Sequence, residues 1–255
     1  MPNGLIITRN DLALLRRDPI PPILLVVMPL IVMAFLKPAF APVLQLMGHQ
    51  GANGAEQVVP GASVMFAYFV VGFSGAFFFR EHIWGTWDRV RASELSNTQI
   101  LTGKLSPGLL MVVIQQAVLF AGGVVLFDLR SAGPMAAVVV VDLAFCLFIV
   151  AFTFLVIALC RTVQQVFAIA GLGAIMLGAV GGAITPLDSM PDWAKTLAPF
   201  TPTYWAMRGF NSVLLDGADL AGVAKPVAVL LAMALACAVV AAIRFSFDDQ
   251  KTGTL

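Results

Sequence analysis

Charged residues are scarce in this sequence. Its 255 residues include 15 lysines and arginines and 14 aspartates and glutamates, together 11% of the chain. A soluble domain carries about 25% charged residues. Apolar residues make up 60%, in long runs that indicate an integral membrane protein and exclude a water-soluble domain. The net charge of +1 gives no reason to expect a nucleic-acid partner.

Motifs of nucleotide, metal and covalent chemistry are also lacking. The stretch TGKLS at 102–106 lacks the first glycine of a phosphate-binding loop and the hydroxyl that follows its lysine. Neither H-E-x-x-H nor G-x-S-x-G occurs. His49 and His82 lack nearby metal-binding partners, and the three cysteines lie in apolar runs without metal or redox spacing. We therefore expect no catalytic residues, no metal site and no cofactor in this chain.

Six apolar stretches are long enough to cross a bilayer, which requires about 20 residues of helix. They lie at 20–40, 61–79, 107–127, 135–160, 163–184 and 225–243. Between the fourth stretch and the fifth, only Cys160-Arg161-Thr162 interrupts the apolar run. Arginine is costly at mid-membrane, so we expect a tight turn around Arg161. The sequence thus predicts an all-α polytopic protein, with six transmembrane helices in a single domain over 1–255.

Lysine and arginine predict the orientation of these spans. With both termini inside, ten of these residues fall on inner segments and five on outer segments. The inner ones are Arg9, Arg16, Arg17, Arg80, Arg89, Arg91, Lys104, Arg161, Arg244 and Lys251. The outer ones are Lys37, Arg130, Lys195, Arg208 and Lys225. This bias predicts that both termini are cytoplasmic.

The chain begins with a moderately amphipathic stretch, GLIITRNDLALLRR at 4–17. It predicts a helix within 1–19 that lies along the inner membrane surface, with a disordered tail as the alternative. Spans 1 to 5 then occupy 20–184, and span 6 with a cytoplasmic tail occupies 225–255.

The inner loop at 80–106 contains a charged and aromatic stretch. Residues 80–96, REHIWGTWDRVRASELS, hold six charged residues and two of the four tryptophans. Helical spacing predicts a short amphipathic helix over 83–94. On or beside its apolar face are Ile83, Trp84, Trp87, Val90 and Arg91. Two interpretations are open: a solvated loop with tryptophans at the lipid headgroups, or a helix that docks in a groove of another protein, which the charges of alternating sign suit.

The long outer segment at 185–224 is rich in proline and tryptophan. Prolines at this density preclude one continuous helix, so we expect short helical pieces that dip into the outer interface. An ordinary loop is the alternative, and the near-absence of charge at 196–207 speaks against it. The residues singled out are Pro191, Trp193, Pro199, Pro202, Tyr204, Trp205 and Arg208.

Small and polar residues inside the spans raise two further questions. Ala170, Ala174, Gly178 and Gly182 form a stripe on span 5, which favours close packing within the bundle over a dimer seam. Asp142 is an acid within span 4. Two interpretations of Asp142 are open. It acts as a proton or ion relay, or it lies near enough to the outer end of span 4 to reach water or pair with Arg130.

Taken together, these features resemble the type-2 family of ATP-binding-cassette (ABC) exporter permeases. Two stretches carry the resemblance. Pro60-Gly61 opens span 2, which runs into REHIWGTWDRVRASELSNTQILTGK, similar to the family's acidic-glycine-threonine-arginine-serine loop. MPDWAKTLAPFTPTYWAMRGF is similar to the family's outer proline-tryptophan segment. One departure is Glu94, where family members often have proline.

The resemblance implies partners and roles. The inner helix is then a coupling helix seated in a cleft of a separate ATPase subunit, which binds ATP and Mg²⁺. Two ATPases would join two permeases, the second being an identical or a related chain. The implied ATPase-contact residues are Glu81, Ile83, Trp84, Trp87, Asp88, Val90 and Arg91. The implied location is the inner (plasma) membrane of a bacterium.

The resemblance also implies a substrate path lined by spans 1, 2 and 5. Candidate lining residues are Phe66, Phe69, Phe73, Phe77, Gln115 and Gly178. A mostly apolar lining suits a hydrophobic or amphiphilic cargo such as a drug, an antibiotic, a lipid or a lipid-linked glycan. The alternative is an ion-coupled secondary transporter or a membrane-embedded enzyme, which predicts buried ion sites or clustered acids and histidines.

Overall fold

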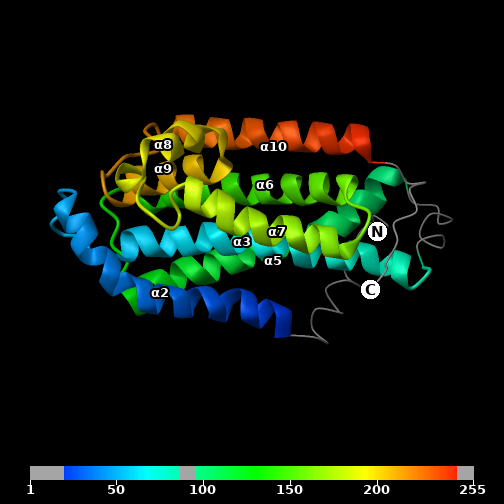
Figure 1. Cartoon of the computed structure of the whole chain (residues 1–255), viewed down its shortest axis with the longest axis horizontal. Helices are drawn as coiled ribbons and strands as arrows, with labels where there is room; N and C mark the ends of the chain where they lie inside the picture. The colour runs from blue at the N-terminus through cyan, green and yellow to red at the C-terminus, as the bar shows by residue number, and fades with distance from the viewer. Residues whose placement is uncertain (1–19, 87–95, 246–255) are drawn as a thin grey trace.

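The computed structural model describes residues 20–86 and 96–245 (Figure 1). The helices long and apolar enough to cross a membrane are α2 (Ile20–Leu46), α3 (Ala55–Ile83), α5 (Asn97–Phe127), α6 (Met135–Leu159), α7 (Val163–Val180) and α10 (Ala224–Arg244). The shorter ones are η1 (Leu187–Ser189), α8 (Asp192–Leu197), η2 (Ala198–Phe200) and α9 (Pro202–Leu214). No strand occurs in the described ranges, so the predicted all-α fold with six spans is confirmed. The surface helix predicted within 1–19 lies outside them.

The six long helices lie side by side, with α3 at the centre (Figure 1). This helix packs against α2, α5, α6, α7 and α9, and it is the most buried of the six spans. Its Tyr68 is fully buried, with the hydroxyl 3.0 Å from that of Thr203 in α9 and the ring edge-on to Phe145 of α6. We call the end of the bundle where α3 finishes the Trp84 end, and the opposite end, with α8 and α9, the α9 end.

α5 is longer than the sequence predicted. It begins at Asn97 instead of 107, and Ser96 and Gln99 hold its first turn in a capping box. Pro107 lacks the N–H that would bond to the carbonyl of Gly103, and the Ser106 hydroxyl donates to that carbonyl at 3.2 Å. The prediction of a loop as far as 106 was therefore wrong, because the proline does not end the helix.

The tight turn predicted around Arg161 is confirmed. α6 ends at Leu159 and α7 begins at Val163. The Thr162 hydroxyl accepts the backbone N–H of Gln165, and the Gln165 side-chain oxygen accepts the N–H of Arg161 at 2.8 Å. These two bonds replace helical bonds at the chain reversal and separate spans 4 and 5.

The small-residue stripe of α7 packs inside the bundle, against α3, as predicted. Its buried members within α7 are Ala170, Ala174 and Gly178; Gly182, the fourth residue of the predicted stripe, is buried but lies beyond the end of the helix at Val180, with a φ of +92°. Two glycines of α3 complete the contact. A Cβ atom at Gly72 would lie 2.7 Å from the ring of Phe167, and one at Gly75 would lie 2.5 Å from a methyl of Val166. Side chains of α7 therefore occupy notches that only glycine leaves open.

The proline-rich segment after α7 consists of short helices, as predicted. Pro191 immediately precedes α8, and Pro202 is the first residue of α9. Proline is favoured at a helix start because the N–H it lacks has no partner there. The placement of this segment relative to a membrane stays a prediction.

Candidate transport path and its two ends

Four phenylalanines form a half-buried stripe along α3, which we call the phenylalanine face. Phe66, Phe69, Phe73 and Phe77 recur at helical spacing, and each ring is partly exposed. Phe66 and Phe69 have ring centroids 5.5 Å apart, and Phe73 meets Phe167 of α7 edge-on at 5.9 Å. α3 lies between α2 and α7 (Figure 1). The structure therefore brings these four predicted path residues together on one apolar surface.

The other two predicted path residues lie behind this surface. Gln115 of α5 is 2% exposed, and its amide contacts backbone carbonyls of α2 and α3. Gly178 of α7 is buried, and a Cβ there would lie 3.4 Å from the side chain of Met65. Both residues pack helices together in this protomer, and their predicted role in lining the path stays a prediction.

At the Trp84 end, the phenylalanine face continues into an exposed tryptophan. The Arg80 guanidinium lies 4.6 Å from the ring centroid of Phe77 and 5.1 Å from that of Trp84. Cation–π attraction of this kind is worth about 0.5–1 kcal/mol at exposed sites. Ile83 and Trp84 are 51% and 61% exposed. Arg80 thus links the last ring of the face to an apolar surface at the end of α3.

The predicted amphipathic helix over 83–94 does not begin at Ile83. Ile83 is the last residue of α3, and Trp84 and Gly85 form a turn in which Gly85 has a φ of +64°. That backbone conformation favours glycine and breaks the helical spacing from Ile83 onward. The predicted contact residues Trp87, Asp88, Val90 and Arg91 lie outside the described residues. Glu81 belongs to α3, and its side chain is likewise outside the description.

At the α9 end, aromatic and proline residues tie the short helices together. The indole N–H of Trp205 donates to the carbonyl of Pro199 at 2.9 Å, and Arg208 donates to the Tyr204 hydroxyl at 2.7 Å. Trp205 is 9% exposed, whereas Trp193 is 63% exposed. Trp205 is therefore held within the bundle by a hydrogen bond, whereas Trp193 is exposed, and whether either lies at a membrane surface stays a prediction.

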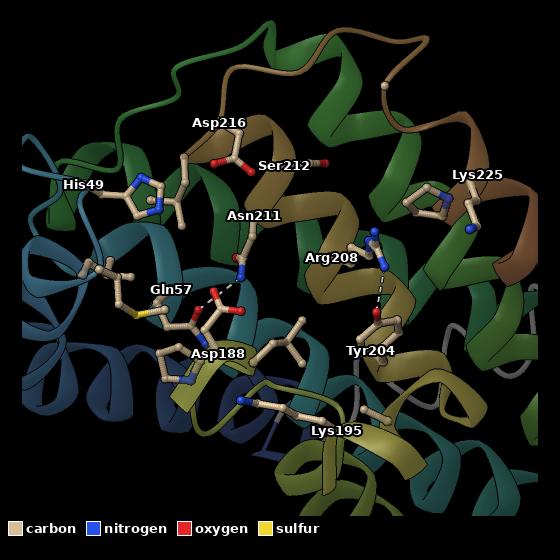
Figure 2. A pocket seen from close by; sticks show the side chains of 18 residues that line it. His49, Gln57, Asp188, Lys195, Tyr204, Arg208, Asn211, Ser212, Asp216 and Lys225 are labelled. Carbon is tan, nitrogen blue, oxygen red and sulfur yellow. Dashed lines mark hydrogen bonds between the residues drawn. The ribbon is translucent and has the colours of Figure 1, made fainter. Parts of the chain in front are cut away.

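A cleft of about 670 Å³ opens beside α9 (Figure 2). Charges of both signs line it: Asp188, Lys195, Arg208, Asp216 and Lys225. Fully buried Gln57 of α3 accepts a 3.4 Å hydrogen bond from Asn211 of α9 and donates to the Gly182 carbonyl at 2.8 Å. Polar groups thus join α3 and α9 at this cleft, while the phenylalanine face is apolar.

Comparison with known proteins places this arrangement in a family. The profile of the ABC-2 type transporter family matches residues 3–215. The chain belongs to the ABC-2 type transporter family. It is therefore a multi-pass membrane protein of a kind that serves as a transport component.

Two curated relatives are named as permeases. The chain is 29% identical over 150 residues to the linearmycin resistance permease protein LnrN of Bacillus subtilis (strain 168), over 59% of this chain and 39% of that protein. It is 31% identical over 125 residues to the probable multidrug ABC transporter permease YbhR of Escherichia coli (strain K12), over 48% and 33%. The chain thus spans less than half the length of these two relatives. No solved structure matches it.

Asp142 of this ABC-2 type transporter does not pair with Arg130. Arg130 donates instead to Asp128 at 2.6 Å, at the start of the α5–α6 connection. This hydrogen bond lowers the pKa of the Asp128 carboxyl. Asp142 has a buried Oδ1 atom without a hydrogen-bond partner among the described residues. The pairing considered for Asp142 was therefore wrong, because a nearer acid takes the arginine.

Sequence reasoning missed the polar pair at the α9-end cleft. Gln57 precedes the predicted start of span 2 at 61, so it lies outside the spans that the sequence predicts. Asn211 follows Tyr204 by seven residues and Arg208 by three, which puts all three on one face of α9. That helical spacing could have been recognised once the segment was divided at Pro202.

Proposed function

We propose that this ABC-2 type transporter is the permease subunit of an exporter that moves a hydrophobic or amphiphilic cargo out of the cytoplasm or inner leaflet. The observation that carries the proposal is the phenylalanine face of α3, an apolar surface that runs along the central span. Its rings suit an apolar cargo through burial of area and not through specific hydrogen bonds. The names of the two relatives support a drug or an antibiotic as cargo.

ATP would be hydrolysed on a separate subunit that binds Mg²⁺, with two ATPases and two permeases in each complex. The Trp84 end supplies the supporting geometry, because Ile83 and Trp84 expose large apolar side chains at the end of α3. An ATPase seated there would push on the same helix that carries the phenylalanine face. Closure of the ATPase pair would then bias α3 between two arrangements, inward-open and outward-open.

The test is ATP-driven transport by permease and ATPase together in vesicles, with an amphiphilic fluorescent dye as cargo. We expect transport that requires ATP and is indifferent to a pH gradient. The ion-coupled alternative is favoured only by the unpartnered Asp142 oxygen. Transport by the permease alone along a pH gradient, abolished by Asp142→Asn, would replace the exporter proposal with that alternative.

The phenylalanine face predicts a specific effect on cargo affinity. Phe69→Ala and Phe73→Ala should each raise the half-saturating dye concentration about fivefold, since losing a half-buried ring removes roughly 1 kcal/mol of apolar contact. The matched control is Leu235→Ala, a 66% exposed apolar residue of α10, a helix that α6 separates from α3 (Figure 1). Equal effects of the three substitutions on half-saturation would contradict a path along α3.

We further propose a bacterial inner membrane location with cytoplasmic termini, supported by the bias of lysine and arginine. The Trp84 end would then face the cytoplasm and the α9 end the outside. In a background without the three native cysteines, Asp219→Cys should react with an impermeant thiol reagent added outside intact cells. Thr86→Cys should react only after the cells are opened. The reverse pattern would invert the topology.

A further inference from the structure

Pro29 interrupts the backbone hydrogen bonds of α2 within an apolar span. In an α-helix each N–H donates to the carbonyl four residues earlier. Pro29 has no N–H, so the carbonyl of Leu25 loses its helical partner. Leu25 is 4% exposed and Pro29 is also buried. Since water is scarce inside a bilayer, that carbonyl needs a donor from another part of the protein.

Gln115 of α5 supplies the donor. Its side-chain Nε2 donates to the Leu25 carbonyl at 2.9 Å and lies 3.4 Å from the carbonyl of Phe66 on α3. The side chain is 2% exposed, so the amide is enclosed by the three helices. One amide group therefore joins the proline break of α2 to the first residue of the phenylalanine face.

We propose that Gln115 is a positioning residue of the transport path. Its amide takes the place of the N–H that Pro29 lacks, and holds α2 at the proline break against Phe66. This role differs from the lining role that the sequence predicted, because the amide is committed to backbone carbonyls. The effect on transport rests on the proposed exporter function, whereas the bond to the Leu25 carbonyl does not.

Gln116 provides an internal comparison. It is fully buried, and its Nε2 donates to the carbonyl of Ser63 on α3 at 3.0 Å. Residue 67, four positions after Ser63, is an alanine whose N–H is available to that carbonyl. Gln116 therefore adds a second bond to a carbonyl that has a helical donor. The two glutamines share helix, burial and bond length, and only Gln115 compensates for a proline.

A similar replacement occurs in α5, where the Ser106 hydroxyl donates to the Gly103 carbonyl, to which Pro107 has no N–H to donate. There the donor is the neighbouring residue on the same helix. At Pro29 the donor comes from a different span, so the bond also fixes the position of α2 relative to α5 and α3. This difference gives Gln115 a positional role that Ser106 lacks.

The experiment is a double-mutant cycle between Gln115 and Pro29. Gln115→Met removes the amide at nearly constant size, and Pro29→Ala restores the backbone N–H to the Leu25 carbonyl. In the Pro29 background, Gln115→Met should lower ATP-driven dye transport about fivefold or more and the thermal midpoint of the purified permease by about 3 °C or more. In the Pro29→Ala background, both effects of Gln115→Met should fall to less than a third.

Gln116→Met is the matched control, and it should change both readouts by similar amounts in the two backgrounds. Equal losses from Gln115→Met with and without Pro29 would overturn the proposal, and so would no loss in either. If the wild-type pair shows no ATP-driven transport, the exporter function fails. The thermal cycle, which uses the permease alone, still decides whether Gln115 replaces the missing N–H.

Discussion

Trp84→Ala should weaken the binding of the proposed ATPase subunit to this chain by about 30-fold. Trp84 is an exposed aromatic residue at the end of α3, and truncating an aromatic anchor at an interface commonly costs about 2 kcal/mol or more. The ring also contacts the Arg80 guanidinium, which in turn contacts Phe77 of the phenylalanine face. ATP-driven transport should therefore fall together with binding. The measurement is titration of purified ATPase onto the permease in lipid discs.

Trp193→Ala is the matched control, since Trp193 is also a tryptophan and is 63% exposed, against 61% for Trp84. It lies in α8, at the α9 end of the bundle (Figure 1). We expect this substitution to leave ATPase binding unchanged within twofold. If both alanine variants bound the ATPase like the wild type, the Trp84 end would lose its assignment as the ATPase-contact surface.

Gly61→Ala should strongly reduce the yield of folded protein. Gly61 lies in α3 near the α9 end, where an added Cβ would lie 2.3 Å from the backbone carbonyl oxygen of Ala183. A flexible side chain could turn aside, but here the backbone beyond α7 has to move. Overpacking costs about 1–3 kcal/mol, and occasionally more, so we expect about 3 kcal/mol less free energy of unfolding. Chemical unfolding in detergent micelles measures it.

Gly171→Ala on α7 is the corresponding control. A Cβ at Gly171 would meet no atom within 4 Å beyond its chain neighbours and the backbone of its own helix, and alanine is favoured over glycine within a helix by up to about 1 kcal/mol. This variant should be as stable as the wild type or more so. A loss of stability at Gly171 equal to that at Gly61 would show that the close contact with Ala183 is not the cause.

The spans could be predicted because membrane crossing imposes a length and an apolar composition that sequence displays directly. Even the short turn at Arg161 followed from the cost of a charge at mid-membrane. The ends of helices were harder to predict. α5 continues through Pro107 because the Ser106 hydroxyl donates to the Gly103 carbonyl in place of the N–H that Pro107 lacks. A hydropathy profile does not detect a local replacement of this kind. Hydropathy likewise omitted Gln57, a buried polar residue in the first turns of α3.

Some residues of the candidate site could likewise be predicted from the sequence, and others could not. Periodicity alone places Phe66, Phe69, Phe73 and Phe77 on one face of a helix, and the structure shows that this face is partly exposed. Gln115 could not be assigned from sequence, because its role depends on a proline 86 positions earlier (115 − 29) in another helix. Partners of buried amides are set by tertiary packing, and no local pattern reports them. Trp205 turned inward for the same reason, toward the carbonyl of Pro199.

The glycine notches of α3 fix how α7 can lie along it. Phe167 faces Gly72 and Val166 faces Gly75. A slip of one helical turn, about 5.4 Å, would bring Val166 against Val71 or Phe79, two side chains that are fully buried and leave no notch. α3 and α7 can therefore pack against each other in only one register. Any sliding between helices that transport requires has to occur where α3 meets its other neighbours.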